Sequence, residues 1–307
     1  MTRTIDLPHL TLFSATLLSG ALVCMMLGFM VWIAWPVLSA EGIGFIINSE
    51  WSYSAHTYGI GKFIVGTIWL TLVTLVLTLP IGIATAIFLS ELVPRWLDGI
   101  LRSFIELLVG IPSVVYGLFG YIILEPIFRD TLNPTISSVF GWIPFIGQND
   151  PTTGLGIFLA AVVLTVMILP TVVALSREAM RAVPDQLREA SYAMGTTKQE
   201  TIFRIVIPSA FGGIMTSVVL ATMRAMGETM AIAMLMGGLN KAPTTLFDGG
   251  TVMTTKILAD IGYYFASPEP RAALFGIAVV LFLIEMGFVA VLRLISNRWK
   301  EKGVAHA

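Results

Sequence analysis

Long stretches without a charged residue, or with very few, dominate this sequence. A helix that crosses a membrane needs about 20 mostly apolar residues. Six stretches meet that length, between residues 6 and 41, 62 and 91, 102 and 125, 150 and 177, 204 and 241, and 271 and 293. Their apolar residues run continuously instead of alternating with period two, so the pattern predicts helices and not barrel strands. The predicted fold class is all-α, a polytopic membrane protein with six transmembrane helices.

The composition supports a membrane protein and excludes several other classes. Only 12% of the 307 residues are charged, about half the fraction in soluble domains. A net charge of −1 argues against nucleic-acid binding, which needs a basic surface. With one cysteine and three histidines far apart in sequence, neither an intrachain disulfide nor a metal site is expected.

Lysine and arginine predict the orientation of the spans. With the N-terminus inside, the inner segments hold twelve of the eighteen Lys and Arg residues, the outer segments hold five, and Arg224 lies within a span. An excess of positive charge marks the cytoplasmic side. Both termini are therefore predicted to be cytoplasmic.

Three outer connections are long and carry aromatic residues among glycine and proline. The connections are 37–63, 126–153 and 238–270, and the aromatic residues are Trp51, Trp142, Phe145 and Tyr263. Such loops can cap a cavity or receive a partner, or their aromatic rings can anchor the chain at the membrane interface. The sequence leaves these interpretations open.

The inner loop 176–208 carries strong signals of its own structure. Pro184 suits the first turn of a short helix, and Gly195 suits the left-handed position that ends it. Thr197 followed by Glu200 three residues later has the spacing of a capping box that opens a second helix. The loop is predicted to be a helix, a tight turn and a second helix.

The same loop resembles the cytoplasmic loop of permeases from ATP-binding-cassette (ABC) importers. That family carries Glu-Ala-Ala, three residues, glycine, nine residues, and Ile-x-Leu-Pro. This chain has Glu189-Ala190-Ser191, then Gly195, then Ile205 to Pro208 at the same spacing, with Ser191 and Ile207 as departures. The resemblance implies the ABC type I importer permease fold and a loop that couples to a separate ATPase. The residues implied in that coupling are Glu189, Ala190, Gly195, Ile205 and Pro208.

Two further segments resemble the permeases of phosphate-specific importers. They are Pro-Ser-Val-Val-Tyr-Gly at 112–117 and Arg-Ala-Met-Gly-Glu-Thr at 224–229, and the second resembles the PstC-type subunit in particular. The implied function is ATP-driven import of inorganic phosphate by alternating access. A PstA-type partner permease, or a permease for another oxyanion such as sulfate or molybdate, remains an alternative.

The resemblance also implies a domain organisation and a location. Residues 1–62 would form an accessory helix with its external loop, 63–295 the permease core with the coupling loop 176–208, and 296–307 a cytoplasmic tail. The location implied is the cytoplasmic (inner) membrane of a bacterium or archaeon.

The implied partners are a second, PstA-type permease, two PstB-type ATP-binding subunits, an external PstS-type phosphate-binding protein, and membrane lipid. The chain has no phosphate-binding loop of its own, because its one Gly-Lys pair, Gly61-Lys62, is followed by Phe63. ATP and Mg are therefore expected in the partner, and no cofactor or enzymatic activity is expected in this chain. An intramembrane enzyme is the alternative from another class, but no His-Glu-x-x-His motif is present.

The fifth span contains a pair of opposite charges. Arg224 and Glu228 are four residues apart, which places them on one face of a continuous helix. A charge at the bilayer centre costs about 2.5–3.5 kcal/mol, so an arginine there suggests a path for anions, with Glu228 holding it in place. Thr229 and Ser113 complete the predicted substrate path. The alternative is an ion pair that only lets the helix insert.

Prolines and glycines also occur within the second, third and fourth spans. Kinks are predicted at Pro80, Pro112 and Pro170, and close helix packing at Gly110, Gly117 and Gly120. Glu106, about one turn inside the third span, is expected to have a structural role.

Overall fold

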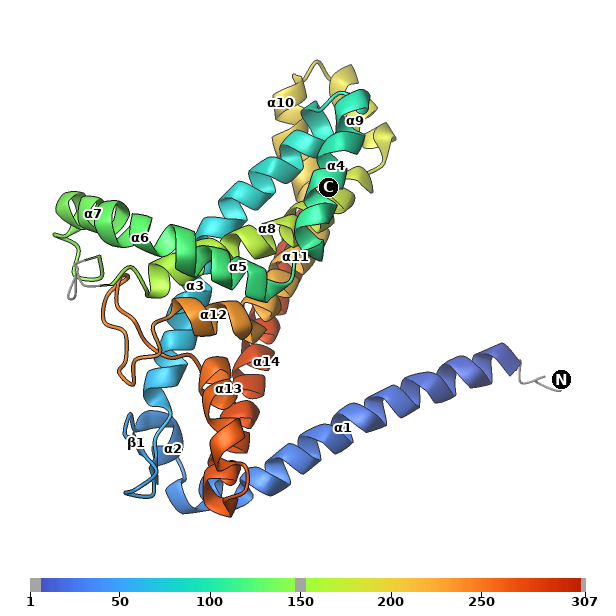
Figure 1. Cartoon of the computed structure of the whole chain (residues 1–307). Coiled ribbons are helices and arrows are strands. Elements are labelled where there is room, and N and C mark those ends of the chain that lie inside the picture. The colour runs from blue at the N-terminus through green and yellow to red at the C-terminus, as the bar shows by residue number, and fades with distance from the viewer. Residues whose placement is uncertain (1–6, 147–152, 305–307) are drawn as a thin grey trace. The chain divides into compact units, whose positions relative to one another are not determined.

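The computed structural model describes residues 7–146 and 153–304, and most of them belong to helices (Figure 1). The chain divides into two compact units, one of residues 1–61 and 257–283 and one of residues 62–256 and 284–307. All predicted site residues, from Ser113 to Thr229, belong to the second unit.

Five helices in the described ranges are long and apolar enough to cross a membrane. The first span, Thr11–Glu41, lies in α1 (Leu7–Glu41), and the second, Gly61–Leu92, consists of α3 (Gly61–Ile87) and the π-helical turn Phe88–Leu92. The third of these helices is α8 (Ile157–Arg181). The fourth, Lys198–Gly227, ends with α11 (Ile207–Gly227), and the fifth, Pro268–Arg298, lies in α14 (Pro268–Val304). A bent pair of helical segments, Trp96–Gly110 and Ser113–Phe140, meets the same criterion together. Counting this pair as one span gives the six that the sequence predicts.

The third span is broken and not merely kinked. Its first half is α4 (Arg95–Gly110), its second half begins with α5 (Ser113–Phe119), and the segments Trp96–Gly110 and Ser113–Phe140 meet at 90°. Ile111 and Pro112 are both extended, with ψ of 127° and 142°. Proline lacks an amide hydrogen and disfavours the helical conformation in the residue before it, so the break falls at this pair. Pro80 and Pro170 lie inside the helices α3 and α8.

The chain beyond α5 stays helical further than predicted. The connection expected from residue 126 continues through α6 (Glu125–Ile127), the π-helical turn Phe128–Leu132 and α7 (Asn133–Phe140). Trp142, just past α7, is 79% exposed. The Phe145 ring stacks on Trp69 of α3, with centroids 4.1 Å apart. Residues 147–152 of this connection lie outside the described ranges.

An aromatic cluster forms the core of the first unit. The antiparallel strands β1 (Trp51–Ser52) and β2 (Thr57–Tyr58) follow the short helix α2 (Gly44–Ile47). Tyr53, between these strands, stacks on Tyr264 at a centroid distance of 3.8 Å and donates a hydrogen bond to Asp260. Burial and this bond raise the pKa of Tyr53. Trp51 is buried in this cluster, so it belongs to the protein core and is not an interfacial anchor.

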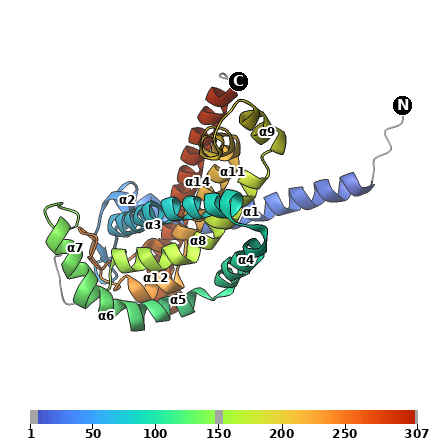
Figure 2. The ribbon, with the colours of Figure 1, turned by 90° about the horizontal axis from the view of Figure 1, so that it is seen from above.

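Helix α8 is the centre of the second unit. Its residues 157–176 include no charged side chain, and two thirds of its most apolar window is buried, as expected of a helix surrounded by protein. It packs along α11 and also contacts α4, α5 and α12 (Met230–Leu235) (Figure 2). Helix α8 supplies half of the buried residues in the main hydrophobic cluster.

Threonine hydroxyls buried along α3 and α8 are all hydrogen-bonded. Thr67, Thr71 and Thr74 each donate to the backbone carbonyl four residues earlier at 2.8 Å. Thr78 donates to Thr165 of α8 at 3.2 Å. These bonds replace the hydrogen bonds with water that the hydroxyls lose when they are buried.

Two glycines allow α5 and its continuation to approach α12 closely. A Cβ atom added to Gly117 would lie 3.0 Å from the Cα of Ala231 and 2.9 Å from the sulfur of Met234. One added to Gly120 would lie 2.9 Å from Leu235. The predicted close packing is therefore present at these two glycines. It is absent at Gly110, where a Cβ would meet nothing within 4 Å.

We expect Gly117→Ala to destabilise the protein by about 1–3 kcal/mol, because an atom is forced into a closely packed contact with backbone. Thermal unfolding of the purified chain in detergent measures the effect. Gly110→Ala is the matched control and should unfold at the wild-type temperature or slightly above it. Equal unfolding temperatures for the two variants would contradict the packing described here.

Candidate functional site

The segment 184–208 forms the predicted helix, turn and second helix. Pro184 directly precedes α9 (Asp185–Ala193), and its extended backbone separates α9 from α8. After the turn, α10 (Lys198–Thr201) continues through a π-helical turn (Ile202–Val206) into α11.

Gly195 occupies the left-handed position that the sequence predicts, with φ of +81°. Its amide donates to the carbonyl of Tyr192 at 2.9 Å. No atom lies within 4 Å of where its Cβ would be. The requirement for glycine therefore comes from the backbone conformation and not from crowding.

The capping box at the start of α10 is also formed. The Thr197 hydroxyl accepts a bond from the amide of Glu200 at 3.3 Å, and the Glu200 carboxylate accepts one from the amide of Thr197 at 2.9 Å. These reciprocal bonds fix the start of the second helix.

The outward surface of this segment is apolar and acidic. Leu187 and Tyr192 are each 45% exposed, and Met194 is 85% exposed. Glu189 and Ala190 are exposed beside them. Large apolar side chains grouped on an exposed surface occur at contacts with other proteins and at contacts with the membrane.

The remaining residues of the predicted coupling set lie further along the segment. Ile205 is half-buried in the π-helical turn, and Pro208 is exposed in the first turn of α11. They belong to the junction that joins α10 to α11 and do not share the surface of α9.

Arg224 lies near the end of α11 and is half-buried. Its Nη1 atom donates to the hydroxyl of Thr171 on α8 at 3.1 Å. Among the described residues of its unit, no carboxylate lies within ion-pairing distance of this guanidinium. Arg224 is thus oriented by a neutral hydroxyl group.

The prediction that Glu228 holds Arg224 in place is wrong, since no ion pair joins these two residues. Helix α11 ends at Gly227, Glu228 is extended with ψ of 134°, and α12 begins at Met230. One carboxylate oxygen of Glu228 accepts bonds from the amides of Thr229 at 3.1 Å and Ala231 at 3.4 Å. Glu228 therefore satisfies the start of α12 and does not hold Arg224 in place, a role that Thr171 fills.

The predicted substrate-path residues Ser113 and Thr229 each lie at a helix break. Ser113 is the first residue of α5, directly after the break at 111–112. Thr229, whose hydroxyl donates to the carbonyl of Gly227 at 3.2 Å, lies in the break before α12. Because α5 packs against α12 (Figure 2), the two breaks lead into helices that touch. Among the described residues, Ser113 forms no hydrogen bond with Arg224, Glu228 or Thr229.

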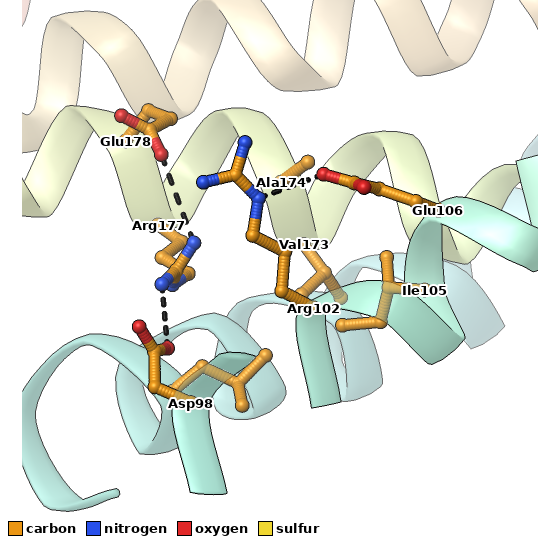
Figure 3. A pocket seen from close by; sticks show the side chains of 9 residues that line it. Asp98, Arg102, Ile105, Glu106, Val173, Ala174, Arg177 and Glu178 are labelled. Carbon is orange, nitrogen blue, oxygen red and sulfur yellow. Dashed lines mark hydrogen bonds and ion pairs between the residues drawn. The ribbon is translucent and has the colours of Figure 1, made fainter. Parts of the chain in front are cut away.

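A separate charged cavity of about 200 Å³ lies between α4 and α8 (Figure 3). The charged residues that line it are Asp98, Arg102, Glu106, Arg177 and Glu178. Arg177 pairs with Asp98 at 2.5 Å, and Arg102 pairs with Glu106 at 2.7 Å. The Arg102–Glu106 pair is exposed and lies within α4, and the structural role of Glu106 stays a prediction.

Comparison with known families gives a match over most of the chain. The family model described as "Binding-protein-dependent transport system inner membrane component" matches residues 78–301. That range contains every predicted site residue.

Curated relatives agree with this family. The phosphate transport system permease protein PstC of Xylella fastidiosa (strain Temecula1) is 34% identical over 275 residues, covering 89% of this chain and 84% of that protein. PstC of Mesorhizobium japonicum is 33% identical over 290 residues, covering 92% and 85%. The probable ABC transporter permease protein YqgH of Bacillus subtilis is 36% identical over 261 residues, covering 84% and 79%.

Solved structures show the same fold. A bacterial ABC transporter involved in the import of the acidic polysaccharide alginate is 15% identical, with a TM-score of 0.54, covering 94% of this chain and 99% of that one. An amino acid ABC transporter with histidines is 18% identical, with a TM-score of 0.52, covering 80% and 95%. The predicted type I importer permease fold is confirmed, in a multi-pass protein of the inner membrane. The chain therefore belongs to the binding-protein-dependent transport system inner membrane components and, within them, to the PstC-type permease subunits, which are transport proteins and not enzymes.

Proposed function

We propose that this permease moves inorganic phosphate into the cell by alternating access, driven by ATP hydrolysis in a partner subunit. The relatives named PstC support phosphate as the substrate. The observation that carries the proposal is the half-buried Arg224, which has a hydroxyl partner and no carboxylate partner among the described residues of its unit.

The chemistry of Arg224 suits a phosphate path. Phosphate carries one to two negative charges at neutral pH and needs a compensating cation in a region of low dielectric. A guanidinium can offer two parallel donors to phosphate oxygens, which the ammonium of a lysine cannot match. With one nitrogen bonded to Thr171, the group has donors left for a passing anion.

The neighbouring residues of the path have distinct roles. Glu228 stabilises the break before α12 through its bonds to two backbone amides, and its negative charge favours release of a bound anion. Thr229 and Ser113 line the two helix breaks and offer hydroxyls along the path. Phosphate import is therefore assigned to the place where α11 and the third span are interrupted.

The partners follow from the type of transporter. An ABC importer of this family needs a second permease, here of PstA type, two PstB-type ATPase subunits that use ATP and Mg, and an external PstS-type binding protein. The exposed apolar surface of α9 is the proposed contact with an ATPase subunit, on the residues Glu189, Ala190 and Gly195 and the junction at Ile205 and Pro208.

Orientation is tested by cysteine labelling. In a Cys24→Ser background, Lys198→Cys should react with a membrane-impermeant maleimide only from the cytoplasmic side, and Tyr263→Cys only from outside. The expected pattern follows from the excess of lysine and arginine on the inner segments. The reverse pattern would place α9 outside, where no ATPase could bind it.

The role of the α9 turn is tested at Gly195. Gly195→Val must adopt a left-handed conformation that costs a branched residue about 1–3 kcal/mol, so ATPase binding and phosphate uptake should both fall. Gly195→Asn is the matched control and should retain most of both, since asparagine tolerates this conformation. Glu189→Lys should weaken ATPase binding without affecting membrane insertion. Wild-type binding and uptake in both Gly195→Val and Glu189→Lys would remove this segment from the coupling path.

The substrate path is tested at Arg224 in the reconstituted complex, by measuring ATP-driven vesicle uptake of phosphate, sulfate and molybdate. A charge-assisted hydrogen bond contributes about 1.5–3 kcal/mol, so Arg224→Gln should lower phosphate uptake by roughly ten- to a hundredfold. Assembly and ATP hydrolysis should be retained. Arg224→Lys should be intermediate, and Glu228→Gln milder because it keeps an acceptor oxygen for the amides.

Two outcomes would contradict this assignment. Wild-type uptake by Arg224→Gln would make the arginine a structural residue. Preferred uptake of sulfate or molybdate by the wild-type complex would change the substrate while leaving the path in place.

A further inference from the structure

Helix α9 is attached to its surroundings mainly by polar contacts. Ser191 is its one buried residue among those described, and the Ser191 hydroxyl bonds to the hydroxyls of Thr196 at 2.7 Å and Thr201 at 3.0 Å. Those bonds stay within the segment 184–208. They hold α9 to α10, and the bond to Thr201 also reaches the first turn of the membrane-spanning segment Lys198–Gly227.

Among the described residues, Arg188 is the α9 residue whose side chain forms hydrogen bonds outside that segment. Its Nη1 atom donates to both carboxylate oxygens of Glu91, at 2.8 and 2.7 Å, and its Nη2 atom donates to the carbonyl of Met180 at 2.9 Å. Glu91 lies in the π-helical turn that ends the α3 span, and Met180 lies in the last turn of α8. One guanidinium therefore joins α9 to two membrane helices.

This contact is largely shielded from water. The side chains of Glu91 and Arg188 are 8% and 16% exposed, whereas the Arg102–Glu106 pair of α4 is 60% and 62% exposed. A shielded charge pair is screened less by salt than a surface pair. The planar fork of arginine also fixes the direction of the contact, which a lysine would not.

The two ends of α9 are suited to rotation. Pro184 interrupts the helix on one side, and the left-handed Gly195 interrupts it on the other. No helical hydrogen-bond ladder therefore continues from α9 into α8 or α10. Without Arg188, the Ser191–Thr201 bond would still join α9 to the segment that continues into α11, but no described side-chain hydrogen bond would join α9 to α3 or α8.

We propose that Arg188, through Glu91 and the Met180 carbonyl, is the tether that carries displacement of α9 into α3 and α8. Arg188 is thus a positioning residue of the transport cycle. The inference rests on the proposed docking of an ATPase subunit on α9.

The test uses the reconstituted complex and compares phosphate uptake with ATP hydrolysed. Arg188→Gln and Glu91→Gln should each keep ATPase binding and hydrolysis but lower the phosphate taken up per ATP. The expected loss is about tenfold or more, since removing one partner of a shielded charge pair shifts a two-state equilibrium by at least that factor. The matched control Arg102→Gln, which breaks an exposed pair within one helix, should keep the wild-type ratio.

A charge-swapped double variant distinguishes loss of the Arg188–Glu91 contact from loss of folding. Glu91→Arg combined with Arg188→Glu should recover a substantial part of the ratio that either change alone removes. If the pair only stabilised the fold, Arg188→Gln and Glu91→Gln would lower the unfolding temperature without changing the phosphate taken up per ATP hydrolysed.

Two results would overturn the tether. One is a wild-type ratio of uptake to hydrolysis in both Arg188→Gln and Glu91→Gln. The other is loss of ATPase binding in Arg188→Gln with normal binding in Glu91→Gln, which would make Arg188 a docking residue. Failure of the proposed function itself would look different, because the wild-type and Arg102→Gln complexes would then neither bind the ATPase subunit nor take up phosphate.

Discussion

Hydrocarbon offers a polypeptide backbone no hydrogen-bond partner, and the structure depends on meeting that constraint. Unbroken helices meet it by themselves, but two spans of this permease are interrupted. Side chains supply the missing partners at both breaks. The Tyr116 hydroxyl donates to the carbonyl of Leu108 near the end of α4, and the Glu228 carboxylate accepts the amides that open α12. Irregular backbone is thus kept where polar side chains can complete it, and such places are where a polar solute can cross.

Several arginines of the second unit are paired with carboxylates. Arg177 is paired with Asp98, Arg188 with Glu91, and Arg129 with Glu125 and Asp130. Arg224 departs from this pattern, since a threonine is its hydrogen-bond partner. The phosphate path proposed above uses this departure, because the anion being carried would supply the charge that pairs with Arg224.

Much of this architecture is readable in the sequence because it depends on local signals. The apolar runs predict the spans, Gly195 predicts the left-handed turn, and the spacing of Thr197 and Glu200 predicts the capping box. Each signal acts within a few residues. The position of the bend at Pro112 is also predicted by a local signal. The angle of the bend is not, because a proline alone does not distinguish a kinked helix from a right-angled break.

Long-range contacts account for what the sequence does not predict. The four-residue spacing of Arg224 and Glu228 suggests an ion pair. The residues between them include no proline that would predict the end of the helix, after which the Glu228 carboxylate bonds to backbone amides instead. Arg188 and Glu91 are 97 residues apart, so no periodicity brings them together. Trp51 lies in a loop typical of an interfacial anchor, but its ring contacts Tyr53 and Tyr58, and Tyr53 in turn stacks on the sequence-distant Tyr264. The identity of each side chain is plain in these cases, and its partner is set by the fold.

The exposed leucine, tyrosine and methionine of α9 also have a consequence for how the cell maintains this subunit. A copy made in excess of its partners leaves those side chains in water, where chaperones and proteases recognise exposed apolar surface. Binding to a partner removes that surface and stabilises the folded chain by mass action. The amount of permease in the membrane would then follow the supply of its partners, so that subunit ratios correct themselves after synthesis without matched expression of each gene.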